Sequence, residues 1–273
     1  MKKILFIAIL CIVSLGLSAQ ERNLTKMTLK MEKLWKAGDY LEAMDTATLV
    51  LTLDGDNHAA KEFVHRNWDK MQQRAERDIE RLNDPNDLDE AAARCEIYRL
   101  LDEIHGNLSV IKLPLVGYHQ SWVWQPEVSY YSGHYDNERM KTYRLLMSFV
   151  RQSLADRDTE SAGQFVNMAM DKYLLTEGER KKCRKYMVVL CTEELKKVDG
   201  SDKVYDAIYA YDLSVLSLKM DSTQSQIREQ QPILQQHVSD LYLQEANLEL
   251  SKGDSIRANE LFLSAEEWKV NKN

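Results

Sequence analysis

The sequence predicts an all-α fold built from successive pairs of helices, with one insert that interrupts the series. Glycine and proline are scarce, at 10 and 4 of 273 residues, which argues against all-β folds that need a turn about every 8–12 residues. Hydrophobic residues make up 44% of the chain and charged residues 29%, a composition that can bury a core. Apolar residues also recur at helical spacing through several long segments, which is typical of amphipathic helices.

The first 19 residues are predicted to be a secretory signal peptide and not part of the fold. Two lysines precede an apolar run over residues 4–13, and Ala19 before Gln20 offers a suitable cleavage point. The run is too short to span a bilayer and a polar sequence follows at once. An uncleaved N-terminal anchor is the alternative. With cleavage we expect a periplasmic or secreted protein with no stable membrane span.

The mature chain would be acidic and would hold three cysteines. Residues 1–19 carry two lysines and no acidic residue, so their removal changes the net charge from −7 to −9, which disfavours nucleic acid as a partner. Cys11 follows Leu10, where a lipid-bearing cysteine follows a small residue, so lipidation is not expected. The mature chain has an odd number of cysteines, so they cannot all form disulfides. Cys95, Cys183 and Cys191 are expected to be buried, free thiols.

Five long segments with helical periodicity are predicted to be the first helices of the pairs: residues 24–36, 59–82, 137–155, 177–197 and 225–251. Each is followed by a helix that carries a small residue with core positions four and seven residues later, a spacing that lines one helical face. These triplets are Ala43, Ala47, Val50; Ala91, Cys95, Tyr98; Ala162, Val166, Ala169; Ala207, Tyr211, Ser214; and Ala258, Phe262, Ala265. Any amphipathic helix offers one such triplet, so the argument depends on five copies in chain order.

Two of the turns between paired helices share a Gly-Asp dipeptide, at Gly38-Asp39 and Gly253-Asp254. Glycine supplies the left-handed conformation that ends one helix, and aspartate caps the next. Across the turn and second helix these two segments resemble the tetratricopeptide (TPR) repeat, and the other three copies are TPR-like. The resemblance implies a right-handed α-α superhelix (solenoid) of about five helix pairs. The small residues are 45 to 71 positions apart, more than the family's 34, so longer helices are expected.

The predicted organisation is a signal peptide over residues 1–19, two TPR-like pairs over 20–106, an insert over 107–136 and three further pairs over 137–273. The insert is rich in aromatic residues, and long loops of this kind are often functional. We expect it to bind a partner through exposed rings, which give large contact area with few rotamers to freeze. The candidate partner-binding residues are Tyr118, Trp122, Trp124, Tyr130 and Tyr131.

A second interpretation is that the insert folds back and its aromatic rings plug the groove or the joint between the second and third helix pairs, because large aromatics usually bury themselves. Short strands around residues 122–124 and 128–131 are compatible with either interpretation.

Searches for reactive or metal-binding chemistry give weak patterns. His119 and His134, with Glu127 and Asp136 nearby, lack the tight spacing of a metal site, so neither a metal nor another cofactor is expected. The basic run over residues 180–185 is interpreted as a solvated helix face, with an anion contact as the alternative. The chain contains no nucleophile elbow, zincin motif, phosphate loop or dinucleotide fingerprint. A non-enzymatic protein is therefore expected.

Two functions follow as expectations. The first is an interaction scaffold of the bacterial cell envelope that holds a protein or peptide partner. The second is a carbohydrate- or cell-wall-binding module that uses the aromatic insert as a stacking platform. Three triplets, at Asp45-Thr46-Ala47, Asp221-Ser222-Thr223 and Asp254-Ser255-Ile256, match the O-glycosylation signal of periplasmic proteins in Bacteroidota and favour that phylum as the source.

Overall fold

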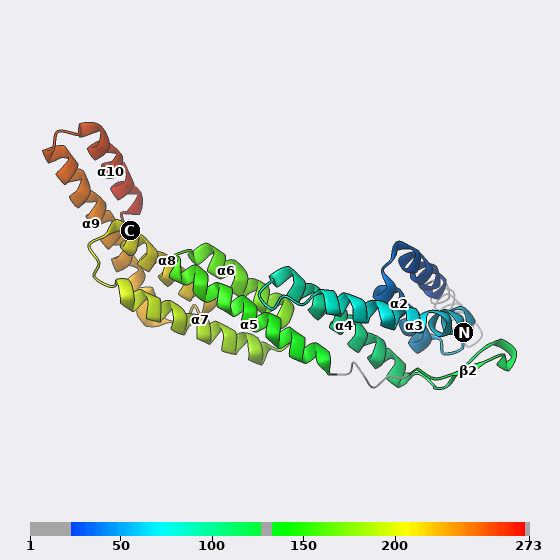
Figure 1. The fold of residues 1–273 in the computed structure, drawn as a ribbon. Helices are drawn as coiled ribbons and strands as arrows, with labels where there is room; N and C mark the ends of the chain where they lie inside the picture. The colour runs from blue at the N-terminus through cyan, green and yellow to red at the C-terminus, as the bar shows by residue number, and fades with distance from the viewer. Residues whose placement is uncertain (1–22, 127–132, 271–273) are drawn as a thin grey trace, which may run out of the picture. The chain divides into compact units, whose positions relative to one another are not determined.

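The structure is a computed structural model that describes residues 23–126 and 133–270, and the predicted signal peptide lies outside these residues. The described chain is helical apart from turns and one short hairpin (Figure 1), so the predicted all-α class is confirmed. Among the helices of the described residues, none has the length and apolar character that crossing a membrane requires.

A helix over residues 23–37 opens the described chain. It is followed by α2 (Tyr40–Leu53), α3 (His58–Arg81), α4 (Leu88–Val110), β1 (Leu115–Val116), the 3-10 turn η1 (Tyr118–Gln120) and β2 (Val123–Trp124). The later elements are α5 (His134–Ala155), α6 (Thr159–Met168), the π-helical turn η2 (Ala169–Tyr173), α7 (Glu177–Val198), α8 (Val204–Met220), α9 (Ser225–Ser251) and α10 (Ser255–Trp268). The five predicted first helices match the observed ones to within three residues at each end.

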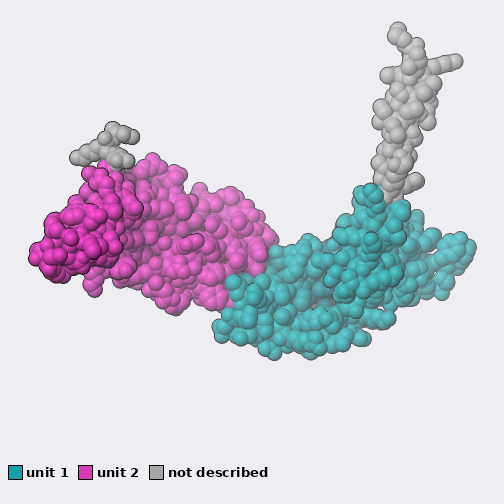
Figure 2. Space-filling model, turned by 90° about the horizontal axis from the view of Figure 1, so that it is seen from above, with its two compact units in different colours: residues 1–142 teal, residues 143–273 magenta. Residues whose placement is uncertain are grey.

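The chain divides into two compact units, residues 1–142 and 143–273, each with its own core (Figure 2). In the first unit α2 packs against both α3 and α4, and Met44, Phe63 and Leu101 are among its fully buried side chains. In the second unit α7, α8, α9 and α10 pack in chain order, and α6 packs against α8. Helices close in sequence are thus neighbours within each unit.

The small residues that begin the five triplets are all buried. They are Ala43, Ala91, Ala162, Ala207 and Ala258, each at most 3% exposed. The larger members Tyr98, Tyr211 and Phe262 are half-buried. The small side chain of alanine allows two helix backbones to approach closely, which explains why an alanine recurs at the first position of each triplet.

The two Gly-Asp turns share a backbone conformation and differ in capping. Gly38 and Gly253 have positive φ values of 98° and 87°, as expected of glycine after a helix. The side chain of Asp254 accepts a hydrogen bond from the Arg257 N–H at 2.9 Å, whereas Asp39 makes no side-chain cap. The predicted aspartate cap is therefore confirmed at the second turn and wrong at the first.

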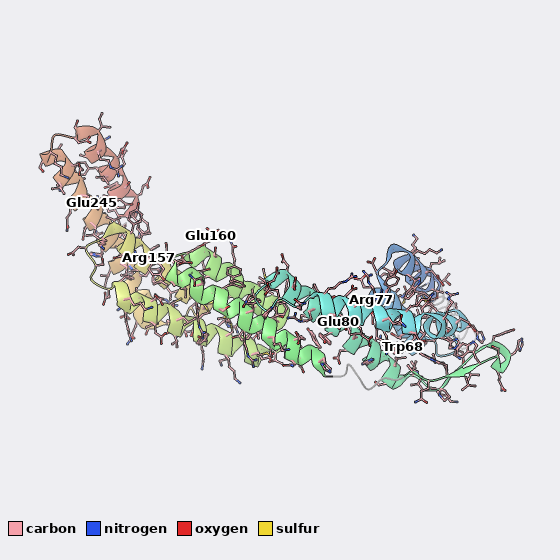
Figure 3. All side chains as sticks on the ribbon, in the orientation of Figure 1. Trp68, Arg77, Glu80, Arg157, Glu160 and Glu245 are labelled. Atoms are coloured by element: carbon pink, nitrogen blue, oxygen red, sulfur yellow. The ribbon has the colours of Figure 1, made fainter. Side chains whose placement is uncertain are left out.

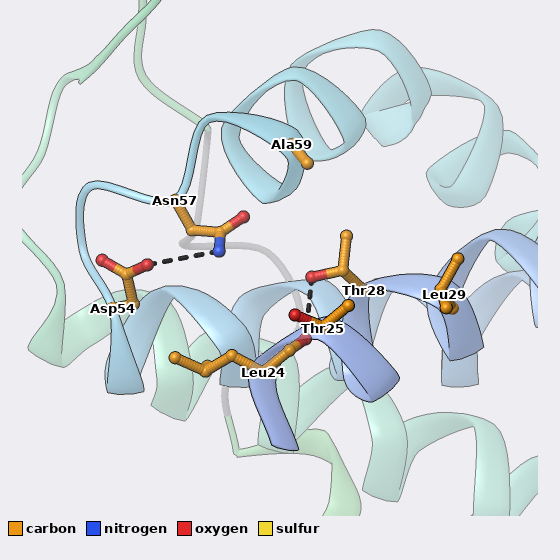
Figure 4. Close-up of a pocket in the computed structure, with 7 residues that line it drawn as sticks. All are labelled: Leu24, Thr25, Thr28, Leu29, Asp54, Asn57 and Ala59. Carbon is orange, nitrogen blue, oxygen red and sulfur yellow. Dashed lines mark hydrogen bonds between the residues drawn. The ribbon is translucent and has the colours of Figure 1, made fainter. Parts of the chain in front are cut away.

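The turn between α2 and α3 shows how local chemistry starts a helix. Asn57 accepts a hydrogen bond from the Ala60 N–H at 3.1 Å and caps α3. Its amide nitrogen donates to Asp54 at 3.2 Å, which fixes the capping oxygen (Figure 4). A hollow of about 330 Å³ opens beside this turn. Two of its polar lining residues, Asp54 and Asn57, are hydrogen-bonded to each other.

Helix extends into both ends of the predicted insert over residues 107–136, because α4 continues to Val110 and α5 begins at His134. At its start, the Asn107 amide donates to Asp45 at 3.0 Å and to Thr48 at 3.1 Å, which ties the last turn of α4 to α2. The expected strand at residues 122–124 is present as β2, and the one at 128–131 lies outside the described residues.

The cysteines behave as predicted, since Cys95, Cys183 and Cys191 are buried and unpaired. Burial raises the pKa of Cys95 to about 11 and that of Cys191 to about 12. Because the thiolate is the reactive form, these are inert packing residues and not nucleophiles.

Candidate functional site

The aromatic insert forms a hairpin that is anchored to the core of the first unit. β1 and β2 are antiparallel, with Leu115 opposite Trp124 and Val116 opposite Val123. Since side chains alternate across a strand, Leu115 and Trp124 share the inner face, where Leu115 is buried in the core and Trp124 packs against it. Val123 points the other way and is 64% exposed.

Trp122 is held by two residues of α3. Its Nε1–H donates to a carboxylate oxygen of Glu62 at 2.8 Å. Its ring stacks on the imidazole of His65, with centroids 4.2 Å apart and an interplanar angle of 8°. The backbone of Gly117 also lies close, because a Cβ added there would come within 2.4 Å of Trp122 Nε1. Edge and face of this indole are therefore both engaged.

Trp124 packs against two rings of α3, those of Trp68 and His65. Its centroid lies 5.7 Å from that of Trp68, at an interplanar angle of 68°, and 5.8 Å from that of His65, at 75°. Such edge-to-face arrangements favour aromatic pairs beyond the area they bury. Trp68, labelled in Figure 3, is itself buried and so fixes the position of Trp124.

The tip of the hairpin is exposed and has an unusual backbone. Tyr118 is 57% exposed and meets the ring edges of His58, at 4.9 Å, and His119, at 3.8 Å. His119 and Gln120 have φ values of 52° and 61°, a left-handed conformation that is unfavourable for side-chain-bearing residues. Such backbone strain clusters at functional sites, and we use the name hairpin tip for Tyr118, His119, Gln120 and the exposed Val123.

One stripe of α3 accounts for all these anchors. His58, Glu62, His65 and Trp68 follow each other at intervals of four, three and three residues, so they lie along one helical face. This stripe was not predicted from the sequence. Their helical spacing beside Trp68 was a signal that could have revealed a docking face for the insert.

The predicted binding residues therefore divide into three groups. Tyr118 is exposed at the hairpin tip, whereas Trp122 and Trp124 are half-buried against α3. Tyr130 and Tyr131 lie outside the described residues. The two tryptophans fold back as in the second interpretation, but the rings that they contact in the described residues belong to α3 and not to a joint between the second and third helix pairs.

The weak metal candidates take part in separate contacts. His134 stacks on Tyr98 with centroids 5.5 Å apart, and Asp136 forms an ion pair with Arg139 at 3.0 Å. Glu127 lies outside the described residues. Within residues 23–126 and 133–270, no three histidine, cysteine or acidic side chains are grouped so as to hold a metal ion.

The basic run of α7 has a structural component. Arg180 donates to the carbonyl oxygens of Met170 and Leu174 at 3.2 and 3.0 Å, around the end of the π-helical turn η2, where backbone acceptors lack helical partners. Arg184 pairs with Glu177. The three lysines of the run, Lys181, Lys182 and Lys185, are exposed, as expected of a solvated face.

Comparisons with known proteins add no family to this description. No protein-family model matches the chain, and no curated protein matches it. The hairpin and the helix α3 that anchors it are therefore the basis for inferring a function.

Proposed function

We propose that this protein is a non-enzymatic scaffold of the bacterial cell envelope, in which about five TPR-like helix pairs form a right-handed superhelix that binds a protein or peptide partner. Three observations support the repeat: five buried small residues in chain order, left-handed glycines at the two Gly-Asp turns, and packing between helices close in sequence. Stacked helix pairs of this kind provide extended surfaces for partners.

The observation that carries the binding site is the hairpin tip. Tyr118 and Val123 are exposed, while Trp122 and Trp124 fix the hairpin to α3 beneath them. A rigid support means that little conformational entropy is lost when the exposed groups dock. Tyrosine on such a support is a typical anchor of protein interfaces.

The proposal is tested by capturing partners from a cell envelope with the mature protein and with paired variants. Tyr118→Ala combined with Val123→Ala removes the exposed groups of the tip and leaves the anchors in place. Tyr205→Ala is the matched control, because it removes an 82% exposed tyrosine elsewhere in the chain. We expect one defined partner that the control retains and the tip variant loses. Equal recovery by both would exclude the tip as the site.

The carbohydrate-binding alternative depends on Tyr118. A stacking platform needs open ring faces, but one face of Trp122 is covered by His65 and the Gly117 backbone lies close to the same ring. Titration of tryptophan and tyrosine fluorescence with peptidoglycan fragments and envelope glycans tests this function. A saturable response that Tyr118→Ala abolishes would favour it over the scaffold.

Export is part of the proposal and has its own test. Mass spectrometry of the protein from the periplasmic fraction should give an N-terminus at Gln20. In the proposed Bacteroidota host, glycan should be found on Ser222 and Ser255, which are exposed, and not on Thr46, which is buried within α2. An intact N-terminus in the membrane fraction would instead indicate an uncleaved anchor.

A further inference from the structure

A hollow of about 280 Å³ in the first unit combines aromatic and basic side chains. It is lined by Trp35, Tyr40, Lys70, Gln73, Arg74 and Arg77, and we call it the basic hollow. Its three cations lie on α3 at intervals of four and three residues, so they line one face over about 10 Å of helix. No acidic side chain lines it, in a chain whose net charge is −7.

The aromatic wall of the basic hollow is held by packing. Trp35 meets the ring of Tyr40 edge-to-face at 4.6 Å and that of Phe63 at 5.6 Å. Phe63 is 1% exposed and belongs to the core of the unit. The wall is therefore positioned before any ligand arrives, which lowers the entropic cost of binding.

Two of the three cations have no acidic partner. Arg74 forms an ion pair with Asp78 at 2.8 Å. Arg77 donates Nε–H to the carbonyl oxygen of Gln73 at 3.0 Å, and within the described part of the chain no ion pair engages it or Lys70. Figure 3 labels Arg77 near the end of α3. Free guanidinium and ammonium donors thus border the hollow.

Acidic side chains line a separate hollow that shares two residues with the basic hollow. Asp39, Glu42 and Asp78 line a neighbouring hollow, which also includes Arg74 and Tyr40. Asp78 engages Arg74, and Asp39 and Glu42 do not line the basic hollow. Positive charge is therefore concentrated on the side formed by Lys70 and Arg77.

We propose that the basic hollow binds an acidic peptide segment that carries an apolar or aromatic side chain between its carboxylates. Lysine and arginine are donor-only groups and an ionised carboxylate is acceptor-only, so the lining and such a ligand are complementary in hydrogen bonding and in charge. Carboxylates two residues apart on an extended peptide are about 7 Å apart, which is within the reach of the cations on α3. The apolar side chain would lie against Trp35 and Tyr40.

A saccharide fits this lining less well. Sugar hydroxyls donate as well as accept hydrogen bonds, and Gln73 and the Tyr40 hydroxyl are the side chains of the lining that can accept one. A nucleic acid would meet long-range repulsion from the negative net charge. The observations therefore favour a peptide.

This site is separate from the hairpin tip. The anchors of the hairpin, His58, Glu62, His65 and Trp68, lie on a different stripe of α3 from Lys70, Arg74 and Arg77, because successive residues turn by about 100° around a helix. The inference therefore goes beyond the proposed function, and each site can be removed without the other.

The test uses the mature protein and a fluorescein-labelled peptide of alternating glutamate and phenylalanine, with a matched peptide of glutamine and phenylalanine. Fluorescence anisotropy should show saturable binding of the acidic peptide that weakens as salt is added. Lys70→Gln combined with Arg77→Gln should weaken binding by about tenfold or more, as expected when two charge-assisted contacts are lost. Both positions are exposed, and circular dichroism should confirm that the variant is folded.

Arg66→Gln combined with Arg81→Gln is the control, because it removes the same charge from exposed positions of α3 outside the hollow. It should change the affinity by less than about threefold, because both arginines lie outside the lining and already pair with Glu32 and Asp78. Equal loss in the two double variants, or equal binding of the glutamine peptide, would overturn the proposal. Tighter binding of a uronic acid oligosaccharide, single-stranded DNA or inorganic phosphate would assign the hollow to a different ligand. Peptide binding should survive in the hairpin-tip variant, which separates this result from the proposed function.

Discussion

The indole of Trp122 lies flat against the imidazole of His65, with ring centroids 4.2 Å apart and ring planes 8° from parallel. The same indole donates a hydrogen bond at 2.8 Å to Glu62, one turn earlier in α3. One residue of the hairpin is thus fixed in two directions by a single helix. The hairpin and α3 are therefore expected to lose structure together.

Replacing Gly117 with alanine tests this coupling. The added Cβ would come within 2.4 Å of Trp122 Nε1, so the ring must move away from His65 and Glu62. We expect a loss of about 1–3 kcal/mol in the free energy of unfolding, as for overpacking of a filled site, and a red shift of tryptophan emission. Urea unfolding followed by fluorescence reports mainly on this unit, because Trp35, Trp68, Trp122 and Trp124 belong to it.

Gly106→Ala is the matched control for that experiment. An added Cβ at Gly106 meets nothing within 4 Å, and alanine favours a helix over glycine by up to about 1 kcal/mol. This variant should be as stable as the parent or more so. Stability equal to the parent in Gly117→Ala would mean that Trp122 is not packed as described.

Stability should depend on pH through His105. Burial lowers the pKa of His105, and the charge of Asp102 opposes this shift only in part. The unfolded chain therefore takes up a proton near pH 6.5 before the folded protein does, so the stabilisation is present above that pH and is lost as the pH falls below it. The free energy of unfolding should fall by up to about 1.4 kcal/mol per pH unit over this range.

Urea unfolding at pH 5.5, 6.5 and 7.5, compared between the parent and His105→Gln, measures this effect. The glutamine variant should be less sensitive to pH even if its overall stability is lower. A parallel pH dependence in the two proteins would assign the effect to another group.

Breaking the largely buried ion pair between Arg94 and Glu138 should destabilise the first unit. Their side chains are 16% and 8% exposed and lie 2.8 Å apart. Burial alone would raise the pKa of Glu138, but hydrogen bonds from Lys141 and Arg94 outweigh it and hold the pKa below its usual value. We expect Glu138→Gln to cost about 3 kcal/mol at pH 7, because Arg94 would keep its charge without an acidic partner and would retain only the carbonyl oxygen of Leu82 as acceptor.

The sign of the pH dependence checks this assignment. Because the folded pKa of Glu138 is lowered, its contribution is present above about pH 4.5 and is lost as the pH falls through the folded value. The parent and Glu138→Gln should therefore converge in acid. Glu96→Gln is the control, since Glu96 pairs with Arg99 at an exposed position and should cost less than about 1 kcal/mol.

Replacing Gly253 should lower the stability of the protein only because of the backbone conformation at this position. Its φ is 87° and an added Cβ would meet nothing within 4 Å, so any cost arises from the left-handed backbone. Gly253→Ala should lower stability by about 1–2 kcal/mol, and Gly253→Asn by less, because asparagine tolerates this conformation better. Thermal unfolding by circular dichroism measures both, with Gly178→Ala as a control at a glycine without positive φ.

The positions of the helices were predictable because each depends on the hydrophobic periodicity of its own segment. The first helix of each pair was located to within three residues, since periodicity and flanking turns are properties of short segments. The ends of the insert were not predictable, because Asn107 extends α4 through hydrogen bonds to Asp45 and Thr48, more than 50 residues away in sequence.

The site was predictable in composition and not in geometry. The aromatic content of the insert made it a candidate, but nothing local indicates that Trp122 meets His65 while Tyr118 stays exposed. The basic hollow was missed entirely, because it combines Trp35 with side chains more than 30 residues later. Both cases require knowledge of which helix faces meet.

The way α3 is used has a consequence for how the sequence can vary. One stripe of the helix enters the core with Val64 and Met71, a second receives the hairpin, and a third borders the basic hollow. A helix with one committed face can change most of its residues freely, whereas this one has little neutral surface left. In a library of single substitutions, α3 should therefore tolerate fewer changes per position than α10, whose buried residues Ala258, Leu261 and Ala265 form a single stripe.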